Sequence, residues 1–279
     1  MRPIGIFDSG LGGLTVLRAI HALMPDEPLL YVADQAHVPY GSRSLDEVRR
    51  FSEAITNYLL HQGARLVVVA CNTASAAALK HLRKVFPGVS FVGMEPAVKP
   101  AAETTHSGVV GVLATPATFQ GELYASVVER FASGVKLLQH TCPGLVAQIE
   151  KGDLDSREIY NILENALKPM LAGGIDTVVL GCTHYPFVMP LIQKITGPGV
   201  RVIDPSPAVA RQVQRLLVAG DLLDLNPPIQ EDALAEPQHL LCFYSTGEPA
   251  RMASLLPLLL GEKHQVEGLS WKAGQLISV

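Results

Sequence analysis

The chain has 279 residues, of which 48% are hydrophobic and 17% are charged. This apolar content suffices for a large folded core and excludes a disordered or fibrous protein. Lys and Arg number 22 against 26 Asp and Glu, giving a net charge of −4. A general nucleic-acid binder normally carries a cationic excess, so we expect no nucleic acid as partner.

Short apolar runs alternate with longer segments of helical periodicity along the chain. The runs are apolar on successive positions, which is typical of strands buried on both faces of a parallel sheet. In chain order, the expected strands are Pro3–Phe7, Leu29–Ala33, Leu66–Ala70, Val89–Gly93, Val109–Ala114, Val135–Gln139, Thr177–Gly181, Val200–Ile203 and His239–Tyr244. The expected helices are Gly13–Leu23, Asp46–Gln62, Ala74–Val85, Glu122–Phe131, Asp155–Leu171, Phe187–Ile195, Ala208–Val218 and Pro249–Leu260. This alternation predicts the α/β class, with mainly parallel sheets.

Three segments of the first half recur in the second half at nearly constant spacing. Gly63–Cys71 matches Gly174–Cys182, and both continue into a polar pair. The other matches are Ile4–Ser9 with Val110–Thr115 and Val92–Pro96 with Val202–Pro205. Three matches in register indicate a duplicated α/β unit rather than chance similarity among Val-rich strands.

The duplication predicts two pseudo-symmetric, doubly wound domains. We assign residues 1–95 plus 208–279 to the first domain and 96–207 to a second domain inserted into it. Ligands of parallel α/β sheets bind beyond the carboxyl ends of the strands. The active site is therefore expected in the cleft between the two domains.

The four cysteines are Cys71, Cys142, Cys182 and Cys242. No secretory signal and no apolar run of the ~20 residues that span a bilayer is found, so we expect a cytoplasmic chain without membrane contact. Disulfides are rare in that compartment, and the spacing fits neither a CxxC pair nor a zinc site. Free thiols and no metal are expected.

Cys71 and Cys182 stand directly after equivalent strands of the two units. A helix that begins at a cysteine favours its thiolate and lowers its pKa, and we expect this for both. Two thiols on opposite sides of one carbon suit inversion of a chiral centre, because one takes a proton and the other returns one. The alternatives are two buried structural cysteines, or thiol–disulfide chemistry, which normally uses CxxC.

Five motifs spread along the chain carry a family resemblance: IGIFDSGLGGLT at 4–15, PYGS at 39–42, ACNTAS at 70–75, CPGLV at 142–146 and LGCTHYP at 180–186. With them, the sequence resembles the cofactor-independent aspartate/glutamate racemase family. Its first and last motifs point to glutamate rather than aspartate. The resemblance implies two similar α/β domains, with the C-terminal segment rejoining the first, no cofactor, and a homodimer. It also implies that L-glutamate is racemised to D-glutamate for peptidoglycan synthesis.

The same resemblance implies roles for individual residues. Cys71 and Cys182 are the expected bases for the two enantiomers. The side chains expected to assist proton transfer are Asp8 and His184, with Asp34 and Glu150 at further acidic positions. The expected substrate contacts are Asp8, Ser9, Tyr40, Gly41, Asn72, Thr73, Thr115, Thr183 and His184.

Other functions stay open at this point. An aspartate racemase or another carbon-acid isomerase of the same family is one. A dinucleotide-dependent oxidoreductase is more distant: Gly10, Gly12 and Gly13 follow a strand, and Asp34 ends the next strand, where an acid would bind a ribose. The third glycine of GxGxxG would however fall at Thr15. A two-lobed binding protein leaves the paired cysteines unexplained.

Overall fold

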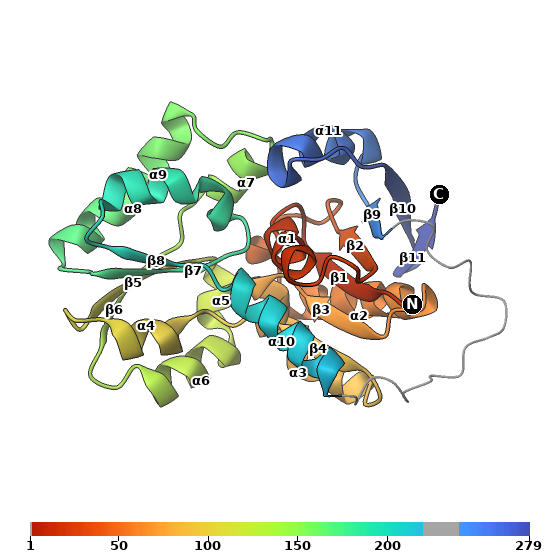
Figure 1. The fold of residues 1–279 in the computed structure, drawn as a ribbon, viewed down its shortest axis with the longest axis horizontal. Coiled ribbons are helices and arrows are strands. Elements are labelled where there is room, and N and C mark those ends of the chain that lie inside the picture. Colours follow the sequence, from red (N-terminus) through yellow and green to blue (C-terminus); the bar gives the residue numbers. More distant parts are fainter. Residues whose placement is uncertain (1, 220–239) are drawn as a thin grey trace.

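The computed structural model describes residues 2–219 and 240–279, which fold into two lobes that each contain one β-sheet (Figure 1). Within these residues the first sheet has seven strands, in the spatial order β11 (Gln275–Ser278), β10 (Val266–Lys272), β9 (Leu241–Ser245), β2 (Leu29–Ala33), β1 (Ile4–Asp8), β3 (Leu66–Val69) and β4 (Ser90–Gly93). The second has four, in the order β6 (Lys136–His140), β5 (Val109–Ala114), β7 (Thr177–Gly181) and β8 (Arg201–Ile203). Neighbouring strands are parallel except β10 and β11, which confirms the expected class.

The sequence repeat is visible in the strand order. The run β2-β1-β3-β4 of the first sheet matches β6-β5-β7-β8 of the second. Strands β3 and β7 therefore occupy equivalent central positions, and Cys71 and Cys182 follow them. The two lobes are pseudo-symmetric, as the repeat predicts.

Helices cover both faces of each sheet because each sheet is apolar on both sides. In the first lobe, α1 (Leu14–Leu23), α10 (Ser206–Val218) and α11 (Pro249–Leu260) pack on one face, and α2 (Leu45–His61) and α3 (Asn72–Val85) on the other. In the second, α7 (Leu145–Glu150), α8 (Arg157–Ala172) and α9 (Met189–Thr196) lie opposite α4 (Val98–Thr104) and α6 (Glu122–Phe131). The short helix α5 (Pro116–Gln120) lies where the lobes meet (Figure 1).

Several elements differ from the sequence expectations. The hairpin β10–β11 was not expected, because the segment VEGLSWK lacks a continuous apolar run. Helices α4 and α5 were also not expected, since seven and five residues are too short for a clear period. Of the expected strand His239–Tyr244, His239 lies outside the described residues. No helix in the described ranges is both long and apolar enough to cross a membrane.

Candidate active site

A small cavity lies between the lobes, beyond the carboxyl ends of the central strands. It is lined by Ser9, Pro39, Tyr40, Gly41, Cys71, Asn72, Thr73, Thr115, Val146, Cys182, Thr183 and His184. The lining includes both expected bases and every expected substrate contact except Asp8. Side chains that the sequence separates by more than 100 positions therefore line the same cavity.

Cys71 caps the N-terminus of α3, as its position after β3 implies. Its thiol accepts a hydrogen bond from the Ala74 N–H at 3.4 Å and lies 3.9 Å from the Ser9 hydroxyl. Burial raises its pKa well above the usual value, and the nearby Asp8 carboxylate adds to this increase. The expectation that the helix dipole lowers the pKa of this thiol is wrong, because desolvation outweighs the helix terminus. Cys71 is held as a neutral thiol.

Cys182 has a different environment. A turn follows β7, and a 3-10 helix (Tyr185–Val188) comes before α9, so Cys182 does not begin an α-helix. Its sulfur lies 3.8 Å from Nδ1 of His184, whose Nε2 lies 2.6 Å from Oε1 of Glu150. Burial disfavours a charged imidazole, but Cys182 and Glu150 outweigh it and raise the His184 pKa well above its usual value. His184 is thus held as a cation beside Cys182.

Glu150 ends α7 and reaches from the second lobe to the first. Besides His184, its Oε1 accepts the Leu11 N–H at 2.6 Å, and its Oε2 accepts from Gln35 at 3.2 Å. Burial favours the neutral acid, but the bonds and charge of His184 outweigh it and lower the Glu150 pKa. Glu150 is not among the residues that line the cavity. Its contacts hold His184 and the β1–α1 turn together across the lobes.

Asp8, at the end of β1, lies directly behind the cavity. One carboxylate oxygen accepts the Gly10 N–H at 3.1 Å, and the other accepts from the Thr183 hydroxyl at 3.4 Å. Its pKa is raised by burial, although the positive charge of His184 opposes this in part. A buried carboxyl with a raised pKa near the Cys71 thiol is suited to proton transfer.

The glycine turn after β1 excludes the dinucleotide hypothesis. A Cβ at Gly10 would collide with the Glu150 carboxylate, and one at Gly12 with the His184 ring. Side chains of the active site therefore occupy the space that a pyrophosphate would need. The turn requires glycine because Glu150 and His184 approach its backbone closely.

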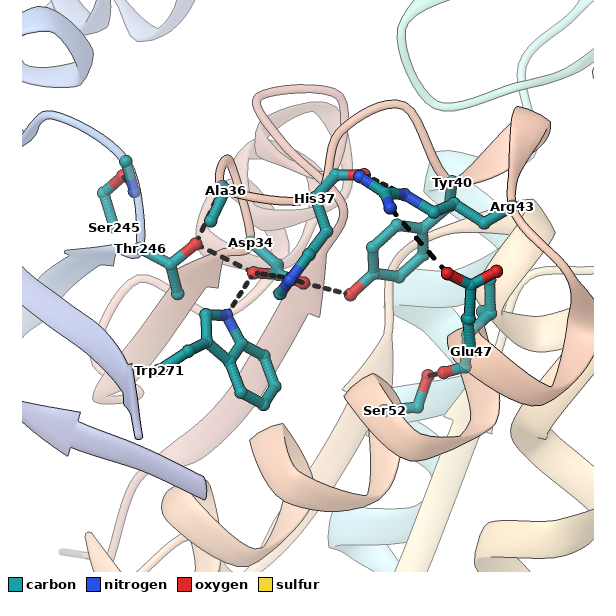
Figure 2. A network of polar contacts seen from close by, with 12 residues as sticks. Asp34, Ala36, His37, Tyr40, Arg43, Glu47, Ser52, Ser245, Thr246 and Trp271 are labelled. Atoms are coloured by element: carbon teal, nitrogen blue, oxygen red, sulfur yellow. Dashed lines mark hydrogen bonds and ion pairs between the residues drawn. The ribbon is translucent and has the colours of Figure 1, made fainter. Parts of the chain in front are cut away.

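Asp34 is not part of the cavity wall. Its side chain is 0% exposed, and it is surrounded by hydrogen-bond donors from His37, Tyr40, Thr246 and Trp271 (Figure 2). A carboxylate with all its acceptor positions occupied cannot bind a ribose or take a substrate proton directly. The structure therefore places this expected assisting residue behind Tyr40, not against the substrate.

Polar groups for a ligand remain on the cavity wall. Both Nδ2 and Oδ1 of Asn72 are buried without a hydrogen-bond partner in the described part of the chain. Thr73 and Thr115 face each other from the two lobes, with their hydroxyl oxygens 2.8 Å apart. A buried amide without partners costs about 1–3 kcal/mol, so it indicates a site that a polar ligand completes.

Three residues of the site were missed from the sequence. Pro39 and Val146 line the cavity, and Gln35 holds Glu150. Pro39 and Val146 do fall within the motifs PYGS and CPGLV, so motif membership was the available signal. Gln35 carries no such signal, because its contact depends on how the lobes meet.

Comparisons with known proteins agree with this geometry. Residues 13–213 match the family model described as Asp/Glu/Hydantoin racemase. The glutamate racemase of Ectopseudomonas mendocina is 49% identical over 264 residues, covering 95% of this chain and 97% of that one. The glutamate racemase of Roseiflexus sp. is 51% identical over 255 residues, covering 91% of each.

A solved structure shows the same similarity in three dimensions. Escherichia coli glutamate racemase, solved in complex with L-glutamate and the activator UDP-MurNAc-Ala, superposes with a TM-score of 0.81 at 32% identity. The match covers 97% of this chain and 99% of that chain. The family match, the relatives and the shared two-lobed fold place this chain in the Asp/Glu/hydantoin racemase family.

Proposed function

We propose that this chain interconverts L- and D-glutamate without a cofactor, with Cys71 and Cys182 as the two bases. One observation carries the proposal: two buried cysteines that follow equivalent strands of the two lobes line the same cavity. The glutamate racemases among its relatives support glutamate as the substrate. Aspartate is the alternative substrate within the family.

The reaction is a proton transfer in two steps. The thiolate of one cysteine removes the α-proton, and the electron pair of the broken C–H bond passes into the α-carboxylate as a carbanion forms. The thiol of the other cysteine then protonates the opposite face of the carbon and becomes a thiolate. Protons and charge balance, and the reverse reaction starts from the same two groups in exchanged states.

The two sides of the cavity are prepared differently. On one side, Nδ1 of the charged His184 lies 3.8 Å from the Cys182 sulfur. On the other, burial keeps Cys71 protonated, with Asp8 close behind it. In this state Cys71 is the group prepared to give a proton.

The developing carbanion needs a dry, polar environment, because an amino-acid α-proton is very weakly acidic. Cys71, Cys182 and Asn72 are at most 5% exposed, so bulk water has little access. The unpartnered amide of Asn72 offers both a donor and an acceptor to the substrate, and Thr73 and Thr115 offer hydroxyls from both lobes.

Proton exchange at the α-carbon tests the function directly. Purified protein freed of pyridoxal phosphate is incubated with L-glutamate in D₂O, while circular dichroism and mass are followed. Loss of optical activity together with deuterium uptake supports a cofactor-free glutamate racemase. Exchange with aspartate alone keeps the chemistry and changes the substrate. Absence of exchange with both contradicts the assignment of the cysteine pair.

Two organisational features belong to the same proposal. The first sheet takes its strands from residues 4–93 and 241–278 and the second from 109–203, which supports domain boundaries near 95 and 207.

A cytoplasmic homodimer that supplies D-glutamate for peptidoglycan is the expected setting. Sedimentation tests the dimer, and rescue of a D-glutamate-requiring bacterium tests the supply role.

A further inference from the structure

The carboxylate of Asp34 joins three segments that are far apart in the sequence. It is fully buried at the end of β2. Tyr40 donates its hydroxyl to Oδ2 at 2.6 Å, and Nδ1 of His37 lies 2.9 Å from the same oxygen. Thr246, after β9, donates to Oδ1 at 2.8 Å, and the indole N–H of Trp271, on β10, donates to it at 2.9 Å. Figure 2 shows these side chains converging on the one carboxylate.

Tyr40 connects this network to the substrate cavity. Its ring is 1% exposed and lines the cavity beside Pro39 and Gly41. A Cβ at Gly41 would come 2.9 Å from the Cβ of Thr115, so this wall packs tightly against the second lobe. A shift of the Tyr40 hydroxyl would therefore displace the cavity wall at the contact between the lobes.

Trp271 connects the network to the C-terminal hairpin. Its ring lies edge-on to His37, with centroids 5.1 Å apart, and His37 stacks on Phe51 of α2 at 3.9 Å. The aromatic contacts fix the position of the indole, so its N–H holds the carboxylate from the side opposite Tyr40 (Figure 2). Strand β10 lies in the first sheet and contributes nothing to the cavity lining.

We propose that Asp34 is a positioning residue, which links Trp271 of the C-terminal hairpin to the Tyr40–Gly41 wall of the substrate cavity. The inference rests on the proposed function, since it takes glutamate as the ligand of that cavity. Asp34 itself exchanges no proton with the substrate. Its role is to hold Tyr40 in its position on the cavity wall. The hairpin contributes to that role through the hydrogen bond from Trp271 to Asp34.

The kinetic test uses Trp271→Phe, which removes the N–H and keeps an aromatic ring. Loss of one hydrogen bond to a buried charge predicts a KM for glutamate raised roughly 3- to 10-fold, with kcat within about twofold. Asp34→Asn is expected to raise the KM more, by ~10-fold or more. The NH₂ group of the new amide is itself a donor, so it cannot accept the hydrogen bond of at least one of the four donors around Asp34. The matched control is Tyr58→Phe, which removes a hydroxyl 3.4 Å from Ser278 in the same hairpin without touching Asp34.

The pH profile separates positioning from proton transfer. A positioning Asp34 leaves the shape of the kcat profile unchanged in Asp34→Asn. A general acid or base would instead lose a limb of the profile and about 10²- to 10⁴-fold in kcat. That result, or an unchanged KM in Trp271→Phe, would overturn the inference. Should Asp34→Asn fail to fold, Trp271→Phe still decides.

A second test is independent of catalysis. Trp271 is the one tryptophan of the sequence, so intrinsic fluorescence reports on this residue alone. Adding D-glutamate is expected to change the Trp271 emission in the wild type, and Tyr40→Phe is expected to remove most of that change. An equal change in Tyr40→Phe, or none in the wild type despite binding measured by calorimetry, contradicts the link. Absence of calorimetric binding would instead contradict the proposed function.

Discussion

His184 and Glu150 form a buried pair, with Nε2 and Oε1 2.6 Å apart and side chains 3% and 11% exposed. The pair raises the pKa of the imidazole and lowers that of the carboxyl, so each holds the other in its charged form. Because Glu150 also accepts the Leu11 N–H from the opposite lobe, the cation next to Cys182 depends on contact between the lobes. The contact between the lobes and the positive charge of His184 are therefore coupled.

Glu150→Gln is expected to narrow the pH range of activity. Without the carboxylate the His184 pKa falls, so the alkaline limb of the kcat profile moves to lower pH. At a pH above the His184 pKa, each unit by which that pKa falls reduces the cationic fraction of His184 about tenfold. The pH profile of racemisation measures this shift. The control is Glu164→Gln, the same substitution in a more exposed pair with Lys168. An alkaline limb unchanged in Glu150→Gln would contradict the coupling.

The same pair predicts how stability depends on pH. The raised His184 pKa stabilises the fold fully below about pH 6.5, and this contribution is lost as pH rises through the folded pKa. The lowered Glu150 pKa acts above about pH 4.3 and is lost as pH falls through the folded value. Urea unfolding should therefore show the largest excess of wild type over Glu150→Gln between those values. An excess that is constant from pH 4 to 9 would argue against the pair.

Both cysteines of the cavity, Cys71 and Cys182, are expected to be needed for inversion. Cys71→Ser and Cys182→Ser should each lose most racemisation and keep the fold, because serine fits the space but is far less acidic. Deuterium uptake without inversion is expected for the one enantiomer that the remaining cysteine can reach. Cys242→Ser, on β9 and outside the cavity lining, is the control. Wild-type rates in both single variants would contradict the two-base mechanism.

The sequence predicts the central strands of the sheets well because these strands are buried on both faces. Leu66–Val69 and Thr177–Gly181 are buried at every position, so their apolar runs identify them without a period. The hairpin strand Val266–Lys272 has one buried residue, Leu269, and polar or small neighbours. Its place in the sheet depends on pairing with β9, which no local pattern records.

The candidate site likewise has features that the sequence predicts and features that it does not. Strand ends locate Cys71 and Cys182, because the carboxyl edge of a parallel sheet collects polar groups. Glu150 and Leu11 are 139 positions apart, and their bond exists only once the lobes meet. The pKa of Cys71 could not be predicted either: the helix terminus is visible in the sequence, but the burial that overrides it is not.

Asn72→Ala is expected to weaken substrate binding without weakening the fold. The amide has no partner in the described structure, so its removal relieves about 1–3 kcal/mol of unsatisfied polarity. A KM for glutamate raised ~10-fold or more, with an unchanged or higher Tm, is the expected result. The control on the same helix is Ser75→Ala, whose hydroxyl bonds the backbone of Val69 and Met94; there Tm falls and KM is kept. A lower Tm in Asn72→Ala would indicate a structural role.

Asp176→Asn is expected to destabilise the second lobe while sparing catalysis. The carboxylate precedes β7 and accepts bonds from the Thr105 hydroxyl and the His106 and Ser107 N–H groups, all within 2.7 Å. Burial opposes its charge, but these donors outweigh burial and hold its pKa far below the usual range. An amide cannot accept all of these bonds, so Tm should fall by roughly 2–4 °C at neutral pH.

The lowered Asp176 pKa fixes the direction of the pH dependence. Its stabilisation is present above the ordinary carboxyl pKa of about 3.9 and is lost as pH falls toward the folded value. The Tm difference between wild type and Asp176→Asn should therefore be constant from pH 6 to 8 and narrow in acid. Asp153→Asn, which weakens a single bond to the Ser156 N–H, should lower Tm less. Because Asp176 lies at the start of β7 and Cys182 follows its end, KM and kcat at 25 °C should match the wild type; a loss of activity at that temperature would mean that the strand transmits the change to the site.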